Sequence, residues 1–184
     1  MWAAIIVIGF FVIVGLAVMG LYNSLVTKRN VVKKSWANID TLLQKRFDLV
    51  PNLVETVKAY AAHEQETFEM VTKARSQWQN AQNVNDVAEA EGMLQGALKS
   101  MFAVAESYPD LKANENFMML QEELAGIEKK IAYSRQRYNN SVMSFNTAIQ
   151  KFPAVIIANS MGFQPEEYFE IDEPEAREAV KVEF

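Results

Sequence analysis

Residues 115–153 read ENFMMLQEELAGIEKKIAYSRQRYNNSVMSFNTAIQKFP. Mostly apolar residues recur in this stretch at alternating steps of three and four positions, as in the seam of a coiled coil. Its members are Phe117, Leu120, Leu124, Ile127, Ile131, Ser134, Tyr138, Ser141, Phe145, Ala148 and Phe152. The spacing predicts one helix of about 35 residues, over about 50 Å long at the standard rise. Asn114 can cap its N-terminus, and Pro153 ends it.

Three further helical patterns precede this one. Apolar side chains recur at helical spacing over residues 32–47, 53–74 and 87–104, and glycine and proline are scarce among them. Pro109 ends the third pattern, because the residue before a proline is pushed out of the helical region. The sequence therefore predicts an all-α fold, an elongated antiparallel bundle of long helices.

A few residues mark the junctions between these helices. Pro51 lacks an N–H, so we expect a bend or break there between the first two helices, with Asp48 as the cap of the second. Arg46 beside Asp48 is interpreted as a local charge pair that fixes this junction. Asp86 and Glu89 have the spacing of a capped helix start. The polar residues just before Asp86 then form the turn.

The N-terminal stretch is apolar throughout. Residues 2–22 read WAAIIVIGFFVIVGLAVMGLY and carry no charge. As a helix they would extend roughly 31 Å, which matches the hydrocarbon thickness of a bilayer. A cleaved signal peptide would need a basic n-region and a small-residue cleavage site, and neither is evident. The sequence predicts a single N-terminal transmembrane helix leading into the bundle.

Basic residues lie on one side of this span. Lys28, Arg29, Lys33 and Lys34 follow it within a dozen residues. By the positive-inside rule, the remainder of the chain stays in the cytoplasm. The same cluster can also meet anionic headgroups. We therefore expect a single-pass membrane protein whose soluble domain is cytoplasmic.

Composition divides the chain into three parts. Residues 1–27 are the transmembrane anchor, residues 28–163 the helical bundle domain, and residues 164–184 an acidic C-terminal tail that we expect to be disordered. The stretch 166–184 holds eight acidic residues against Arg177 and Lys181. The net charge of −5 argues against nucleic-acid binding. Because cysteine is absent, disulfides, thiolate nucleophiles and cysteine zinc sites are excluded.

The single histidine restricts the catalytic possibilities. His63 followed by Glu64 would begin a zinc-peptidase motif, but the second histidine of that motif is replaced by Thr67. A di-iron bundle needs a glutamate three positions before the histidine, where Tyr60 stands. The many helix carboxylates are interpreted as solvated faces. We expect no catalytic, cofactor-binding or metal-binding residues, and therefore neither an enzyme nor a cofactor.

Several ordered motifs give the chain a family resemblance. They are 22–26 (YNSLV), Trp36, Ile39-Asp40, Arg46, 48–55 (DLVPNLVE), 57–64 (VKAYAAHE), 103–113 (AVAESYPDLKA), 120–124 (LQEEL), Arg137-Tyr138-Asn139, Phe152-Pro153, Gly162-Phe163 and Tyr168-Phe169. Over about residues 22–170 the chain resembles the bacterial LemA family. The resemblance implies a single-span membrane protein with a helical domain. It also implies a link to membrane protein quality control, including a membrane zinc peptidase encoded nearby, but it carries over no catalytic residue.

The expected function is that of a membrane-anchored helical scaffold or adaptor in the bacterial inner membrane. Its expected partners are the lipid bilayer, further copies of itself, and a membrane protease or other membrane proteins. Self-association is expected because the long helix outreaches its neighbours, and because residues 155–158 with Phe163 and Phe169 offer a second apolar patch. The alternative is a regulatory or hydrolytic activity centred on His63, Glu64 and Glu55.

Overall fold

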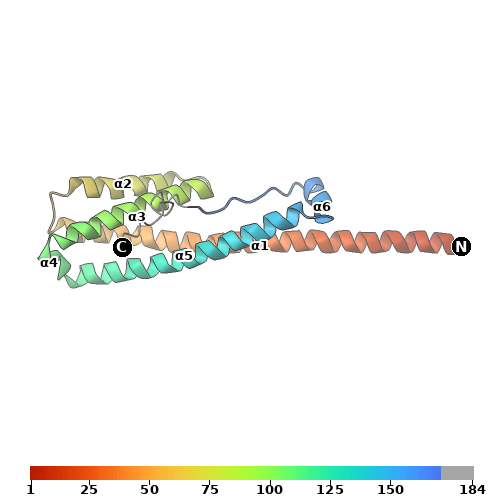
Figure 1. The fold of residues 1–184 in the computed structure, drawn as a ribbon, viewed down its shortest axis with the longest axis horizontal. Helices are drawn as coiled ribbons and strands as arrows, with labels where there is room; N and C mark the ends of the chain where they lie inside the picture. Colours follow the sequence, from red (N-terminus) through yellow and green to blue (C-terminus); the bar gives the residue numbers. More distant parts are fainter. Residues whose placement is uncertain (171–184) are drawn as a thin grey trace, which may run out of the picture. The chain divides into compact units, whose positions relative to one another are not determined.

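The computed structural model describes residues 1–170, and its regular elements there are helices. In chain order they are α1 (Trp2–Lys58), α2 (Gln65–Asn80), α3 (Val84–Glu106), α4 (Pro109–Lys112), α5 (Glu115–Gln150) and α6 (Ala154–Ser160), as Figure 1 shows. The long N-terminal helix packs against the long helix α5 in a bundle. The predicted all-α fold is confirmed.

Two compact units make up the chain. The span unit consists of residues 1–38 and 134–167, and the bundle unit consists of residues 39–133 with residues 168–170. Helices α1 and α5 each contribute to both units, because the boundaries fall inside them. The units are described one at a time below.

The bundle unit has an apolar core formed by α1, α2, α3 and α5. Side chains at every third or fourth position are buried there, as an amphipathic helix face requires. They include Phe47, Leu53 and Val57 of α1, Val71 and Ala74 of α2, Leu94, Leu98 and Met101 of α3, and Phe117, Leu120 and Leu124 of α5. The rings of Phe47 and Trp78 stack with their centroids 4.4 Å apart. The predicted apolar seams are confirmed in this unit.

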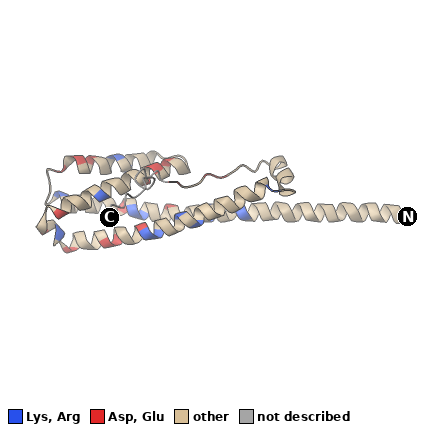
Figure 2. Ribbon diagram, viewed as in Figure 1, with Lys and Arg blue, Asp and Glu red and all other residues tan. Residues whose placement is uncertain are grey.

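The span unit pairs the first part of α1 with the last part of α5. Ser35 and Ser141 lie within hydrogen-bonding distance, and Lys28 Nζ donates to Ser144 Oγ at 2.9 Å. Beyond this paired region, residues 2–22 of α1 are apolar and largely exposed, and Figure 2 shows no charged residue on that part of the helix. Helix α1 is the one helix among residues 1–170 that is long and apolar enough to cross a membrane.

The sequence predicted a bend or a break at Pro51, and the structure shows no break there. Helix α1 continues through Pro51 to Lys58. Asp48 caps no helix and instead accepts a hydrogen bond from Gln44 Nε2 at 3.1 Å. Val50 and Leu53, on either side of the proline, are fully buried. Their burial favours a continued helix and outweighs the one backbone hydrogen bond that proline removes.

The chain instead reverses between Ala59 and Glu64. The pattern predicted over residues 53–74 is therefore divided between the end of α1 and α2. The turn is closed by backbone hydrogen bonds from Ala61 N to Val57 O at 2.9 Å and from Gln65 N to His63 O at 2.9 Å. Both halves of the pattern bury their apolar residues in the same core, which requires a reversal of the chain between them.

Helix caps follow the expected chemistry, with one change of residue. Asn114 caps α5 as predicted, accepting from Phe117 N at 3.0 Å. The start of α3 was assigned to the wrong residue, because its cap is Asn83, whose side chain accepts from Asp86 N at 2.8 Å. Asp86 reaches back to Gln82 N at 3.0 Å, so it closes the cap and does not begin it.

The segment after α6 is held by polar contacts as far as it is described. Asn146 Nδ2 donates to Glu166 O and Asn146 Oδ1 accepts from Glu166 N, both at 2.9 Å. Tyr138 Oη donates to Glu167 O at 2.8 Å. The predicted disorder is therefore wrong for these residues, because side chains of α5 replace water as partners of the backbone. The rest of the acidic tail, residues 171–184, lies outside the described residues.

The predicted second apolar patch is largely covered within the chain. Ile157, Ala158, Phe163 and Phe169 are all buried. Phe152, predicted at the end of the α5 seam, is instead 82% exposed, because α5 ends at Gln150. Ile156 of the predicted patch stays 61% exposed, so part of the predicted apolar surface remains accessible beside Phe152.

Candidate functional site

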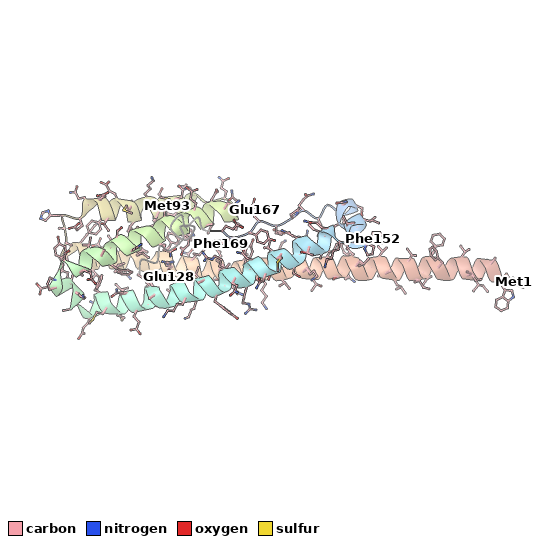
Figure 3. All side chains as sticks on the ribbon, viewed as in Figure 1. Met1, Met93, Glu128, Phe152, Glu167 and Phe169 are labelled. Atoms are coloured by element: carbon pink, nitrogen blue, oxygen red, sulfur yellow. The ribbon has the colours of Figure 1, made fainter. Side chains whose placement is uncertain are left out.

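A buried ion-pair network links three helices of the bundle unit. Arg46 of α1 and Glu91 of α3 are each at most 2% exposed, and Arg46 Nη1 donates to Glu91 Oε1. Arg46 Nη2 lies 3.5 Å from Glu128 Oε2 on α5, and Gln95 Nε2 donates to Glu128 Oε1 at 3.2 Å. Figure 3 labels Glu128 on α5. One guanidinium thus joins α1 to both α3 and α5.

The position of Arg46 follows from the helical period of α1. Leu43, Phe47 and Val50 are buried on the same helix, so Arg46 falls beside the core-facing stripe. A buried charge costs several kcal/mol unless a partner offsets it. The flat guanidinium has donors pointing in different directions and can serve two carboxylates at once. Glu91 provides a buried countercharge, while Glu128 is 46% exposed and keeps contact with solvent.

The Arg46 network can hold the three helices in position relative to one another. A guanidinium has five N–H donors and no acceptor, so Arg46 can bind and orient carboxylates. Within residues 1–170, no group of three or more His, Cys, Asp or Glu side chains is arranged to hold a metal ion. Such a network can fix the register of three helices, which is the best-supported role for a buried ion pair.

The sequence interpretation of Arg46 was wrong. It paired Arg46 with Asp48, whereas the structure pairs Arg46 with Glu91 and Glu128. Glu91 was not singled out at all. A signal existed, because Val87, Leu94 and Glu91 are spaced by steps of three and four, so a charge occupies a position on the apolar stripe of α3. An ionisable residue in such a position predicts a partner on another helix.

The residues of the alternative site lie around the turn between α1 and α2. His63 is exposed there. Glu64 accepts a hydrogen bond from Tyr108 Oη at 3.0 Å. Glu55 lies 3.8 Å from Lys58 Nζ on its own helix, with 78% of its side chain exposed. Among the described residues, Glu64 therefore contacts Tyr108 whereas Glu55 contacts Lys58, and the two carboxylates share neither of these partners.

Tyr108 and Glu64 form a polar corner that holds the turns of the bundle unit together. The hydrogen bond to Glu64 raises the pKa of Tyr108 above its ordinary value, and burial and the negative charge of Glu64 act in the same direction. Asn114 Nδ2 donates to Tyr60 Oη at 3.1 Å nearby. A tyrosine with a raised pKa stays protonated at neutral pH, so Tyr108 can keep donating its hydrogen bond to Glu64 and hold the two turns together.

Comparison with known proteins identifies the family of the chain. The sequence profile of the LemA family matches residues 35–184. The chain belongs to the LemA family. The family resemblance is confirmed, although the match begins at residue 35 and includes the C-terminal tail. The residues of the Arg46 network all lie in the matched part.

Individual relatives are distant in sequence. This LemA-family chain is 26% identical to protein LemA of Metamycoplasma hominis, over 93% of this chain and 77% of that protein. It is 25% identical to magnetosome protein MamQ of Magnetospirillum gryphiswaldense and to magnetosome protein MamQ 2 of Paramagnetospirillum magneticum. These matches cover 80% and 81% of this chain. The chain spans 64% of the length of each magnetosome relative.

Proposed function

We propose that this LemA-family protein is a membrane-anchored helical scaffold or adaptor of the bacterial inner membrane. In this proposal α1 crosses the bilayer once, the helical domain is cytoplasmic, and the protein presents its helical surface to membrane proteins. Membrane protein quality control is the setting that the family suggests, with a membrane protease among the partners. The protein acts by holding partners together and has no catalytic activity or cofactor of its own.

One observation carries the proposal: a single helix supplies both the apolar span and part of the buried core. Helix α1 extends without interruption from Trp2 to Lys58. At its N-terminal end Ile5, Phe10 and Phe11 are all more than 60% exposed, whereas Leu43 and Leu53 are fully buried. Contiguous exposed apolar surface of this size is unfavourable in water and marks a membrane or protein contact. The length of the apolar run favours a bilayer.

The cytoplasmic orientation is supported by the basic residues that follow the span. Lys28, Arg29, Lys33 and Lys34 lie close behind it. A fluorescent protein fused after Phe184 should fluoresce, and alkaline phosphatase fused at the same point should be inactive. Active phosphatase with a dark fluorescent fusion would reverse the orientation.

The experiment that tests the scaffold proposal is crosslinking of the intact protein in native membranes. The recovered partners should be membrane proteins, joined through lysines of the helical domain such as the exposed Lys45. A matched control carries the same domain behind an unrelated transmembrane helix. Partners should be kept in this control if the domain recognises them. Recovery of no membrane protein from either form would refute the adaptor role.

The alternative, an activity centred on His63, Glu64 and Glu55, is supported by the exposed imidazole next to a carboxylate. Replacing all three with alanine separates the two functions. In a deletion strain the triple variant should restore function fully if the protein is a scaffold. A variant that is folded and membrane-inserted but inactive would favour the enzyme.

Self-assembly is also part of the proposal. Its support is the exposed apolar surface of α5 in the bundle unit, where Met118 and Tyr133 are 48% and 62% exposed. Glycines 9, 15 and 20 do not have the small-xxx-small spacing that brings transmembrane helices together, so assembly should depend on the domain. Light scattering of the detergent-solubilised protein should give a mass above that of a monomer. A monomer mass across a wide concentration range would end this part of the proposal.

A further inference from the structure

Three large apolar side chains remain exposed where α5 is followed by α6. Phe152 is 82% exposed, and Ile156 and Met161 are each 61% exposed. Beyond residues 1–22, Phe152 is the most exposed large apolar side chain among the described residues. Figure 3 labels it at the end of α5, beside α1. We call Phe152, Ile156 and Met161 the α5–α6 corner.

Helix α6 is held in place with this surface facing outward. Ala154, Ile157 and Ala158 of the same helix are buried, so one side of α6 packs on the span unit. The opposite side presents Ile156 together with the exposed polar residues Asn159 and Ser160. With Phe152 and Met161, Ile156 gives this end of the span unit an exposed apolar surface of the kind that marks a contact with a membrane or a protein.

Aromatic contacts place this corner beside the end of the apolar run of α1. The ring of Phe163, just after α6, lies 6.0 Å from the ring of Tyr22 and 6.2 Å from that of Phe145, measured between centroids. The guanidinium of Arg29 lies over the same Phe163 ring, 5.0 Å from its centroid. Tyr22 is the last residue of the apolar run, so the segment after α6 is fixed where the proposed span ends.

The pairing of α5 with α1 gives the same position independently. Ser144 of α5 accepts the hydrogen bond from Lys28 of α1. From Ser144 to Gln150 the chain advances six residues, or about 9 Å of helix, and α1 advances by the same length from Lys28 back to Tyr22. The two helices run in opposite directions here (Figure 1), so the end of α5 lies level with Tyr22.

This level corresponds to the interfacial layer of a bilayer that α1 crosses. The polar headgroup layer on each side is about 5 to 8 Å thick, since a bilayer is about 40 to 45 Å thick in total with a hydrocarbon core of about 30 Å. Aromatic side chains favour this layer, and basic side chains next to it meet lipid phosphates. Tyr22 and Phe152 are the aromatics here, and Lys28, Arg29 and Lys151 are the basic neighbours.

We propose that the α5–α6 corner inserts into the headgroup and acyl boundary of the leaflet that α1 enters, as a second membrane contact of the chain. The inference rests on the proposed anchoring by α1. The partner is the phospholipid surface itself, recognised by the three apolar side chains and by the adjacent basic residues. The returning helix α5 is thereby tied to the same bilayer as the span, which restricts rotation of the span unit about the axis of α1.

The test uses single cysteines in the full-length protein, which has no native cysteine to give background labelling. Ile156→Cys carries an environment-sensitive fluorophore and is reconstituted into vesicles of phosphatidylcholine and phosphatidylglycerol with shallow doxyl-labelled lipids. Met119→Cys in the bundle unit is the matched control, because Met119 is 60% exposed and Ile156 is 61% exposed. Ile8→Cys, at a position 63% exposed within the apolar run, reports whether α1 is inserted.

The expected result is at least twofold stronger lipid quenching at position 156 than at position 119, with emission shifted to the blue. Quenching at 156 no greater than at 119, while position 8 is quenched, would overturn the inference and leave the anchor intact. A label at 156 shielded from both doxyl lipid and aqueous iodide would also overturn it, because protein would then cover the corner. Absence of quenching at position 8 would refute the anchoring itself.

A second variant distinguishes insertion from mere nearness to the bilayer. A label at the exposed position Asn159, introduced as Asn159→Cys, is compared with and without serine at all three corner positions. The three side chains are exposed, so their replacement should leave the helical content unchanged. Lipid quenching at 159 should fall at least twofold in the serine variant. Unchanged quenching in a folded serine variant would show that the corner does not insert.

Discussion

Replacing Arg46 with methionine should strongly destabilise the bundle unit. The substitution keeps an unbranched apolar stem at the buried position and removes the guanidinium. The carboxylate of Glu91, itself 1% exposed, then loses the cation that offsets its buried charge. Breaking a buried pair in this way typically costs about 3 to 5 kcal/mol. A domain of this size is stable by about 5 to 15 kcal/mol, so the change removes a large share of that free energy.

The contact of Arg46 with Glu128 adds little to this loss. The two groups are 3.5 Å apart and Glu128 is 46% exposed, so water screens the interaction. Glu91→Gln should therefore cost less than Arg46→Met, because the guanidinium keeps one carboxylate and the new amide can still accept a hydrogen bond. In the double variant Arg46→Met with Glu91→Leu, both charges are absent. Its stability should return to within about 1 kcal/mol of the parent, since an apolar replacement of a buried pair is often neutral or better.

The assay is urea unfolding of the full-length protein in detergent, followed by circular dichroism at 222 nm. With an m value of about 2 kcal/mol per molar, a loss of about 4 kcal/mol moves the midpoint down by about 2 M. Lys45→Met is the matched control, because its ion pair with Glu123 is exposed and should be worth at most about 1 kcal/mol. A loss below about 1 kcal/mol for Arg46→Met, or a double variant no more stable than Arg46→Met alone, would refute the reasoning.

Three further outcomes follow from the structure. Burial, and then the charges of Glu166 and Glu167, raise the pKa of Tyr138 to about 12, so its neutral hydroxyl contributes stability that is complete below pH 10 and is lost as the pH rises through 12. The difference in tyrosinate absorbance at 295 nm between the parent and Tyr138→Phe should therefore develop with a midpoint near pH 12. A midpoint at pH 10 for this difference would contradict the prediction. Pro51→Ala restores an N–H inside α1 and should raise the urea midpoint with unchanged helical content, whereas a lower midpoint would mean that packing of the proline ring outweighs the lost hydrogen bond. Asn114→Ala removes the cap of α5 and should cost about 1 kcal/mol in the same assay, with no loss expected for Asn114→Asp, which can still accept from the backbone.

Local periodicity was sufficient to predict most of the helices. The heptad spacing of α5 survives in the structure because a long helix repeats one simple geometry, and Phe117, Leu124 and Ile131 are buried as predicted. Its cap at Asn114 was also predictable, since the cap is a contact between neighbours in sequence. These features depend on residues within a few positions of one another.

The features that the sequence did not predict depend on contacts between distant segments. The turn at residues 59–64 is required because α1 and α2 share one core, and no local signal there is stronger than the proline at 51, which proved not to interrupt the helix. Arg46 and Glu91 are 45 positions apart, so the obvious local partner, Asp48, was chosen instead. The missed partner could have been found only by asking why a carboxylate occupies an apolar stripe.

Helix register explains why an ion pair occupies a core that apolar side chains could fill. Helices with long apolar seams, such as α1 and α5, gain almost as much burial when they slide past each other by one turn, about 5.4 Å. A slide of that size would separate Arg46 from Glu91 and Glu128 and leave charges buried without their partners. Burying charges without partners costs several kcal/mol, which is far more than the difference in burial free energy between two registers of the apolar seams. The network therefore serves to exclude the shifted packings, and the double apolar variant should keep its stability while losing the penalty that selects one register.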